Sequence, residues 1–344
     1  MGSKLDDLIK NINKDMKGNF VTKGLPQYDY KRIPFTSPRL NYMTFGGIPM
    51  GKLVEFFGEP HGGKTTTALD IVANYQRMEG AKGVLYADIE NGLDPVWATK
   101  LGVKLDDDNF YIIKPECQGA ETIFEQILQL MGTGELGLVV IDSLGAMTSN
   151  KALEESVEQK NYGGISMALT NFSKKAEMLC NKYDCTLLGI NQLRADMNSM
   201  YGGMTTPGGE CWRFLCSVRM EFRLGKYIDS KGNDLTRQAE NPVGNYVLVS
   251  IKKSRTCSPT RRTGYYTINY FTGIDYLKDL IEVAIKYGII VQAGAWFSII
   301  DTESGELVEK LQGQSKVYEY LENDDNIETL QMIERYIDNQ IQES

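Results

Sequence analysis

The stretch Gly58-Glu59-Pro60-His61-Gly62-Gly63-Lys64-Thr65-Thr66 fits the pattern G-x-x-x-x-G-K-[ST] and directly follows the apolar run Leu53-Val54-Glu55-Phe56-Phe57. A strand that leads into a glycine-rich turn and then into a helix is the context that this pattern requires. The glycines allow successive backbone N–H groups to converge on phosphate oxygens, and the helix from about residue 64 to 77 directs the positive end of its dipole towards them. The sequence therefore predicts a site for a nucleoside triphosphate.

One hydroxyl group and one carboxylate are expected to hold a magnesium ion at this site. Lys64 is expected to reach the β- and γ-phosphates, and the hydroxyl of Thr65 is expected to bind Mg²⁺. The run Leu138-Val139-Val140-Ile141-Asp142-Ser143 is typical of a second buried strand. The carboxylate at the end of such a strand, Asp142, supports the cation, usually through water.

Hydrolysis also requires a group that activates water. The segment Asp88-Ile89-Glu90 leaves the expected strand 83–88 at its carboxyl end, which is the edge that borders the ligand crevice in open α/β sheets. Glu90 is our candidate for the base, although spacing alone does not separate it from Asp88. Gln192 ends another expected strand, and a glutamine there can hydrogen-bond the γ-phosphate or the attacking water.

The bulk composition is typical of a soluble globular protein, since 42% of the 344 residues are hydrophobic and 24% are charged. No apolar run approaches the roughly 18 residues of a membrane span, and the first residues lack the apolar core of a signal peptide. The six cysteines include no C-x-x-C pair, and His61 is the only histidine. We therefore expect a cytoplasmic protein without structural disulfides, a His-rich zinc site or a Ser-His-Asp triad.

The net charge of −8 argues, by itself, against a polyanionic partner. Nucleic-acid binding depends, however, on where the basic groups cluster. Five of them lie within eleven positions, namely Lys252, Lys253, Arg255, Arg261 and Arg262, whereas residues 322–344 contain seven carboxylates and one arginine. Such runs most often mark solvated surfaces.

The order of the expected elements predicts an α/β core between an N-terminal helix and a small C-terminal domain. Residues 5–16 carry apolar side chains at helical spacing, and such a helix must dock on the main body or on another subunit. Strands at 83–88, 138–143 and 186–191 alternate with helices at 121–131 and 165–182. The segments 218–224, 246–251 and 265–269 are typical of an antiparallel extension, and from Gly273 we expect helices near 315–321 and 327–341 and a hairpin around Trp296. The expected domains are 1–37, 38–272 and 273–344.

The connection Leu193–Gly209 follows Gln192 and is rich in glycine. A connection of this length without structure of its own is usually functional or disordered. A loop that begins at a γ-phosphate sensor is well placed to report the nucleotide state to whatever it contacts, and a plain disordered loop is the alternative.

Together, these segments resemble the bacterial RecA family of DNA strand-exchange recombinases, including its phage-encoded relatives. The resemblance implies a RecA-type P-loop ATPase core, in which a mostly parallel twisted sheet is flanked by helices and extended by antiparallel strands, with an N-terminal polymerisation helix and a small α+β C-terminal domain. The shared segments run in the family's order over about residues 40–300: Gly47-Ile48-Pro49-Met50-Gly51-Lys52, the stretch 58–66, Leu93-Asp94-Pro95, Lys100-Leu101-Gly102-Val103, Ile141-Asp142-Ser143, Asn191-Gln192-Leu193-Arg194, Gly208-Gly209 and Gln292-Ala293-Gly294-Ala295-Trp296-Phe297-Ser298.

The resemblance also implies roles in the nucleotide site. Glu90 matches the family's catalytic glutamate, which decides between it and Asp88. Trp97 lies where the family has an aromatic ring that stacks on adenine, and Asp94 lies where a carboxylate recognises that base. Gln192 matches the residue that couples the γ-phosphate to DNA binding. The implied cofactors are ATP and Mg²⁺.

Two loops, Glu155–Gly164 and Leu193–Gly209, resemble those that grip single-stranded DNA in the family. Backbone N–H groups and one arginine would hold phosphates there, while apolar side chains wedge between bases. The positions implied in DNA binding are Tyr162, Gly163, Gly164, Arg194, Met197, Met200, Tyr201, Gly208 and Gly209.

The family's subunit interface also has counterparts in this sequence. Lys253 and Arg255 match a lysine pair that reaches the neighbouring subunit's ATP, where cations stabilise charge on the γ-phosphate, and Phe214 matches an interface aromatic. The implied activity is DNA-stimulated ATP hydrolysis by a helical filament that pairs single-stranded DNA with a homologous duplex and exchanges strands, with single-strand-binding and mediator proteins as further partners. A hexameric helicase, or a regulatory filament protein without strand exchange, remains an alternative.

Overall fold

The computed structural model describes residues 4–16, 21, 31–154, 165–195, 203–230, 232–236, 238–258 and 260–342. The chain divides into two compact units, Met1–Lys31 and Arg32–Ser344. The first unit contains the expected amphipathic helix, α1 (Lys4–Asp15). No residue of α1 is buried, and the apolar side chains of Leu5 and Leu8 are exposed. The helix therefore exposes two residues of its apolar stripe, Leu5 and Leu8.

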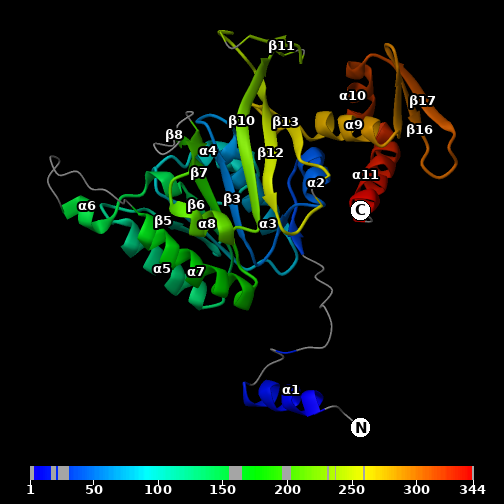
Figure 1. The fold of residues 1–344 in the computed structure, drawn as a ribbon. Coiled ribbons are helices and arrows are strands. Elements are labelled where there is room, and N and C mark those ends of the chain that lie inside the picture. The colour runs from blue at the N-terminus through cyan, green and yellow to red at the C-terminus, as the bar shows by residue number, and fades with distance from the viewer. Residues whose placement is uncertain are drawn as a thin grey trace. The chain divides into compact units, whose positions relative to one another are not determined.

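The second unit is built on one large mixed sheet (Figure 1). The order across the sheet is β14 (Gly273–Ile274), β13 (Thr263–Asn269), β12 (Gly244–Ser254), β10 (Val218–Ile228), β3 (Leu53–Gly58), β7 (Thr186–Gln192), β6 (Leu136–Asp142), β4 (Gly83–Asp88) and β5 (Phe110–Ile113). The six strands from β10 to β5 are parallel to one another. The other three, β12, β13 and β14, continue the sheet in antiparallel fashion, and β11 (Asp234–Leu235) pairs with the end of β10. This arrangement confirms the predicted fold class.

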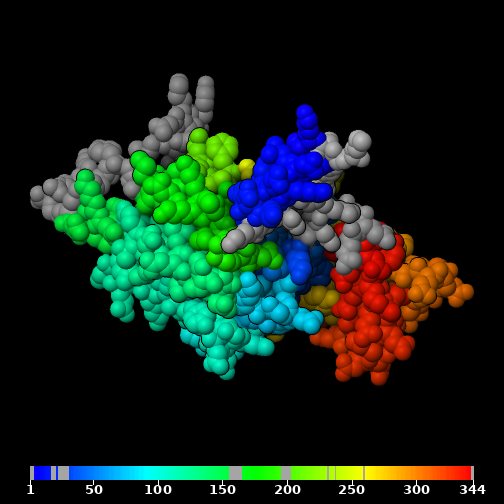
Figure 2. All heavy atoms as spheres, turned by 90° about the horizontal axis from the view of Figure 1, so that it is seen from below, coloured from blue at the N-terminus to red at the C-terminus, as the bar shows by residue number. Residues whose placement is uncertain are grey.

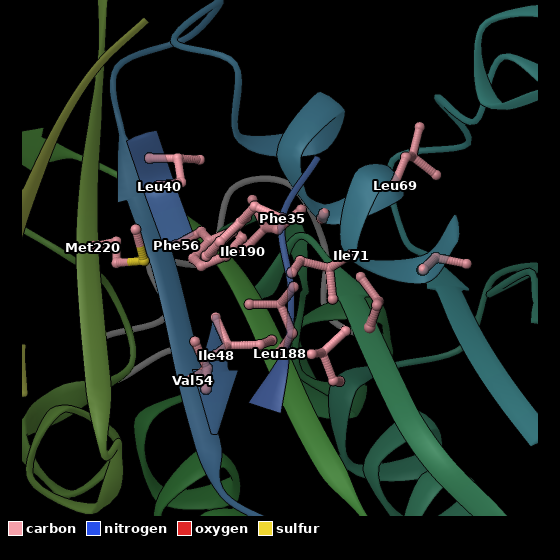
Figure 3. Packing of buried hydrophobic residues seen from close by; sticks show 14 of the residues in the cluster. Phe35, Leu40, Ile48, Val54, Phe56, Leu69, Ile71, Leu188, Ile190 and Met220 are labelled. Carbon is pink, nitrogen blue, oxygen red and sulfur yellow. The ribbon is translucent and has the colours of Figure 1, made fainter. Parts of the chain in front are cut away.

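Successive residues of a strand point to opposite faces of the sheet, so both faces of these buried strands carry apolar side chains. Helices cover both faces. Val54 and Phe56 of β3 belong to the apolar core on one face, whereas Leu53 belongs to the core on the other. Figure 3 shows the first of these cores, where Phe56, Leu188 and Ile190 of the sheet lie close to Ile71. The first face carries α2 (Pro38–Thr44), α3 (Lys64–Arg77) and α4 (Pro95–Lys100), and the second carries α5 (Ala120–Gly132), α7 (Ser166–Tyr183) and α8 (Gly209–Leu215).

Several short elements lie outside the main sheet. The strand β1 (Arg32–Ile33) pairs with β2 (Ile48–Pro49). The 3₁₀-helix η1 (Leu144–Ala146) and the helix α6 (Asn150–Glu154) follow β6. The strand β8 (Arg194–Ala195) pairs with β9 (Met204–Thr205), so the long connection after Gln192 has a two-stranded neck that the sequence did not predict.

The C-terminal elements form a small α+β layer with an apolar core of its own, which includes Leu280, Ile299 and Ile333. Figure 2 shows α11 at the opposite end of the second unit from α5. The hairpin expected around Trp296 is part of a three-stranded sheet. The division at residues 37/38 and 272/273 stays a prediction. The elements of this layer are α9 (Tyr276–Lys286), β15 (Ile290–Ala293), β16 (Trp296–Ile300), β17 (Leu307–Gln312), α10 (Gln314–Glu322), η2 (Asp324–Asn326) and α11 (Ile327–Gln342).

Among the described residues, no helix is both long enough and apolar enough to cross a membrane.

Two buried carboxylates connect the segment before α2 to the rest of the unit. The Thr36 N–H donates to Asp70 Oδ2 at 2.9 Å, and the Ser37 hydroxyl donates to Asp279 Oδ2 at 2.5 Å. Burial raises the pKa of Asp70 to about 6 and that of Asp279 well above its usual range. Asp70 lies on α3 and Asp279 on α9, so this short segment joins the core to the C-terminal layer.

The titration of Asp70 predicts a pH dependence of stability. Its folded pKa lies above its unfolded value, so the folded state binds the proton more tightly, and this stabilisation is lost as the pH rises through about 6. In Asp70→Asn the acceptor of Thr36 remains but cannot titrate. From pH 7.5 to pH 4, the free energy of unfolding of the wild type should rise by roughly 2 to 3 kcal/mol relative to that of the variant. Urea unfolding at both pH values measures this difference.

The exposed Asp108 supplies the matched control, because Asp108→Asn makes the same chemical change in solvent. Identical pH dependence in the wild type and in Asp70→Asn would contradict the prediction.

Candidate functional site

The predicted phosphate loop lies between β3 and α3, at the carboxyl edge of the sheet. Its first glycine, Gly58, has no room for a side chain, because a Cβ there would lie 2.0 Å from the carbonyl oxygen of Phe222 on β10. The last glycine, Gly63, caps α3 with a φ of 88°, in the left-handed region that favours glycine. Lys64 is the first residue of the helix. The local sequence therefore forms the turn that the pattern predicts, with the N-terminus of α3 at its end.

Lys64, Thr65 and Asp142 lie together beyond this turn. The Thr65 hydroxyl donates to Asp142 Oδ2 at 2.8 Å, and the Tyr86 hydroxyl donates to the same oxygen at 2.9 Å. Lys64 Nζ donates to the carbonyl oxygen of Glu59 at 2.7 Å. The predicted cation ligands are thus neighbours, and Tyr86 is a partner of Asp142 that the sequence did not reveal.

The electrostatics of this cluster suit a divalent cation and phosphate. Burial raises the pKa of Asp142, and the carboxylates of Glu90 and Asp88 raise it further. Burial lowers the pKa of Lys64. In the described part of the chain no three His, Cys, Asp or Glu side chains converge as a metal cage. Mg²⁺ is usually held by one or two protein oxygens together with substrate phosphates, so the pair Thr65 and Asp142 fits this ion.

Glu90 and Asp88 have different surroundings. The Ser143 hydroxyl and Gln192 Nε2 both donate to Glu90 Oε1, the latter at 3.0 Å. The buried carboxylate of Asp88 instead accepts the N–H groups of Gly92 and Leu93 at 2.9 and 3.2 Å. Asp88 therefore holds the turn after β4, whereas the exposed Glu90 contacts the glutamine at the end of β7. The structure brings the two predicted residues, Glu90 and Gln192, into direct contact.

A cleft of about 530 Å³ lies next to the phosphate loop, and Trp97 lines it. Trp97 Nε1 donates to the Thr66 hydroxyl at 3.2 Å. Asp94 caps α4, since its Oδ1 accepts the N–H groups of Val96 and Trp97 at 2.9 and 3.3 Å. The indole is thus held at the mouth of the loop, where a nucleotide base would extend from the phosphates.

The opposite wall of this cleft was missed by the sequence reasoning. The Tyr270 hydroxyl donates to Asn245 Oδ1 at 2.8 Å. Asn245 lies on β12 and Tyr270 directly follows β13. Both strands are far along the chain from the phosphate loop and reach it only through their register in the sheet, so no local pattern identifies these residues. The residues of this wall are Leu224, Tyr227, Asn245, Ile268 and Tyr270.

Lys253, Arg255 and Phe214 form a separate group at the end of α8. Lys253 Nζ and Arg255 Nη2 both donate to the carbonyl oxygen of Phe214, at 2.6 Å each, and Lys253 also contacts that of Arg213. The Phe214 side chain is 63% exposed. Neither cation lines the cleft of its own chain. Cations at a helix C-terminus are stabilised by the helix dipole, and burial lowers the pKa of Lys253.

The basic cluster at 252–262 is divided between several structural contacts. Lys252 pairs with Glu221 at 2.8 Å. The guanidinium of Arg261 stacks on the rings of Tyr42 and Phe45, 4.2 and 4.3 Å from their centroids. Lys252 and Arg261 therefore both take part in contacts within the chain.

The predicted DNA-binding positions are only partly described. Arg194 Nη2 donates to the carbonyl oxygen of Gly145 at 2.6 Å, and Gly208 has a φ of 106° and precedes Gly209, the first residue of α8. The other predicted positions, Tyr162, Gly163, Gly164, Met197, Met200 and Tyr201, lie outside the described residues.

Comparison with known proteins agrees with the resemblance seen in the sequence. Residues 3–275 match the model of the RecA N-terminal domain. Protein RecA of Clostridium perfringens is 32% identical over 286 residues, which are 83% of this chain and 75% of the relative. Protein RecA of Thermus aquaticus is 32% identical over 321 residues, which are 92% of this chain and 88% of the relative. Protein RecA of Fusobacterium nucleatum is 31% identical over 287 residues, 83% and 72% of the two chains.

These matches cover most of the chain, and residues 3–275 include the phosphate loop, Glu90, Asp142 and Gln192. The chain therefore belongs to the RecA family.

Proposed function

We propose that this protein is an ATP-dependent DNA recombinase that forms helical filaments on single-stranded DNA, pairs that strand with a homologous duplex and exchanges strands. The observation that carries the proposal is the contact of Glu90 with Gln192 beside Lys64, Thr65 and Asp142, in a chain of the RecA family. The contact between Glu90 and Gln192 connects the proposed hydrolysis site to the start of the long connection that follows Gln192. The proposed setting is the cytoplasm of a bacterial or phage-infected cell, with single-strand-binding and mediator proteins as further partners.

In the proposed reaction, Lys64 and the N–H groups of the phosphate loop hold the β- and γ-phosphates of ATP. Thr65 and Asp142 would hold Mg²⁺, and the ion would supply positive charge beside those phosphates. Ser143 and Gln192 orient the carboxylate of Glu90 through Oε1. Oε2 is then the oxygen that takes a proton from the attacking water. Trp97 and Tyr270 border the space for the base.

Gln192 connects this chemistry to the proposed DNA loop. The side chain of Gln192 contacts Glu90, and Arg194, two residues further, begins the two-stranded neck of the loop. Nε2 of Gln192 carries two N–H groups, so one amide can donate to a γ-phosphate and to Glu90 at the same time. The conformation of the loop, and with it the grip on DNA, is therefore expected to depend on the nucleotide.

Self-assembly is proposed to use α1 and the group at the end of α8. The apolar stripe of α1 requires a partner surface. A shallow groove between α5 and α7, of about 320 Å³, presents the apolar side chains of Leu128, Met178 and Leu179. Glu125, Gln129 and Lys175 complete its lining. We propose that α1 of one copy docks near this groove on the next copy, and that Lys253 and Arg255 face the neighbour's ATP beside the exposed Phe214.

The experiment that tests this function is ATP hydrolysis with and without single-stranded DNA, followed on the same samples by negative-stain microscopy and by an assay for joint molecules between matched DNAs. DNA-stimulated turnover on helical filaments that yield joint molecules supports the proposal. Closed rings would instead indicate a helicase-like motor. Filaments without joint molecules would indicate a regulatory DNA-binding protein, and turnover indifferent to DNA would contradict the assignment of both loops.

Replacement of the proposed base should separate hydrolysis from assembly. Glu90→Gln keeps an oxygen that accepts from Ser143 but removes the proton acceptor, so we expect DNA-stimulated hydrolysis to fall by about 100-fold or more. Filaments on single-stranded DNA with ATP should persist, because the residues that hold the phosphates are unchanged. Steady-state phosphate release and microscopy measure the two effects.

Glu79→Gln is the matched control, because it makes the same change at an exposed glutamate just after α3. Wild-type turnover by Glu90→Gln would show that another group activates the water.

A charge placed in the apolar stripe of α1 should prevent assembly. Leu8 is exposed on α1 in the single chain, and burial of a leucine against a neighbour contributes roughly 2 kcal/mol. Leu8→Asp removes this contribution and adds a charge that the interface would have to desolvate. We expect monomers, by light scattering, at protein concentrations where the wild type forms filaments, with nucleotide binding retained.

Lys10→Asp places the same carboxylate on the face of the helix opposite Leu8, and this variant should assemble as the wild type does. Equal assembly of both variants would remove α1 from the proposed interface.

A further inference from the structure

The connection between Gln192 and α8 returns to the core through a short buried limb. After β9, the side chain of Thr206 is only 3% exposed, and Gly208 begins the turn into α8. The outgoing limb and this return limb pair at the neck, where Arg194 lies opposite Thr205. The return limb, residues 205–208, is therefore part of the folded core and does not belong to the exposed part of the loop.

Asn191 binds this return limb to the sheet. Its side chain is fully buried. Its Nδ2 donates to Glu55 Oε1 at 3.0 Å and to the carbonyl oxygen of Pro207 at 2.9 Å, and its Oδ1 accepts the N–H of Gln192 at 3.0 Å. One amide thus contacts the strand that leads into the phosphate loop, the return limb and the peptide of the residue that contacts Glu90.

Glu55 and Arg219 complete the cluster. Glu55 is a fully buried carboxylate in the middle of β3, and Arg219 Nε on β10 donates to its second oxygen. Arg219 Nη2 also donates to the Thr206 hydroxyl at 3.3 Å, and its guanidinium stacks on Phe57, 4.6 Å from the ring centroid. A buried ion pair contributes little to net stability compared with apolar residues of the same shape. The cost of burying these charges is offset here by hydrogen bonds that end on the return limb.

We propose that Asn191 and Arg219 are positioning residues that fasten the return limb of the loop, through Pro207 and Thr206, to the strand that leads into the phosphate loop. This inference rests on the proposed function. The fastened limb fixes one end of the loop on β3, while the other end begins at Gln192, which contacts Glu90. When the side chain of Gln192 moves, the conformation of the loop then changes, because the other end of the loop is held in place.

The hydroxyl of Thr206 offers a test that leaves the buried charges paired. Removal of Glu55 or Arg219 would leave an uncompensated charge in the core and destabilise the whole fold. Thr206→Val keeps the shape of the side chain and removes only the bond to Arg219, and Thr206→Ser keeps the hydroxyl. Because Thr206 is buried, neither variant alters a surface that DNA could touch.

The measurement is the ratio of ATP hydrolysis with oligodeoxythymidylate to hydrolysis without it, together with the oligonucleotide concentration that gives half-maximal stimulation. For Thr206→Val, we expect that concentration to rise by about fivefold, as for the loss of one hydrogen bond, and the ratio to fall. Thr206→Ser should restore both values. Thermal unfolding of both variants reports any general loss of stability.

Each outcome decides the inference. A lower unfolding temperature in Thr206→Val, with unchanged DNA stimulation, would mean a structural role only and would overturn the inference while leaving the proposed function intact. A wild-type protein that DNA does not stimulate would overturn the proposed function as well. If Thr206→Val does not fold, Arg219→Lys replaces it. Lysine keeps the charge beside Glu55 but has one nitrogen in place of the two, Nε and Nη2, that contact Glu55 and Thr206 separately, and the same rise in the half-maximal concentration is expected.

Discussion

The parallel pairing of β4, β6, β7 and β3 is the constraint on which the candidate site depends. In this register, Gly58 lies opposite Gln192, and Asp88 lies opposite Asp142. The carboxyl ends of parallel strands meet at one edge, so residues far apart in the chain converge without any local signal for their contact. A shift of one residue in any of these pairings would turn the buried side chains of that strand to the opposite face. The apolar cores on both faces therefore fix the geometry of the site.

The same cores explain which parts of the fold the sequence predicts. Strands β3, β4 and β6 are buried along their whole length, and such strands appear as continuous apolar runs with clear ends. The edge strand β5 is an apolar run of only four residues, Phe110–Ile113, and in β17 the apolar pair Leu307-Val308 is followed by two charged residues. Neither gives a signal as clear as that of the long buried strands. The neck of β8 and β9 depends on two residues from each limb, and no periodicity can indicate so short a pairing.

The residues of the candidate site likewise fall into those that the sequence predicted and those that it did not. Motifs that lie within one strand-to-helix connection predicted Lys64 and Thr65, and the paired strand end predicted Asp142. Tyr86, Tyr270 and Asn245 were not predicted, because their positions follow from the register of strands that are distant in sequence. Spacing also left Glu90 and Asp88 equivalent, whereas their hydrogen bonds differ: backbone N–H groups occupy Asp88, and side-chain donors from two other strands reach Glu90.

Strands β3, β4 and β6 each carry a buried carboxylate, and the partners of these carboxylates separate scaffold from site. Glu55 in mid-strand is paired with Arg219 and Asn191, and these bonds end on the loop that returns to α8. Asp88 and Asp142 lie at strand ends, where burial and mutual repulsion raise the pKa of Asp142. Apolar residues in these positions would cost less. Asp88 and Asp142 lie at the edge that holds the phosphate loop, and Glu55 fastens the loop that begins beside it. These three buried carboxylates are therefore explained by the site and not by the stability of the fold.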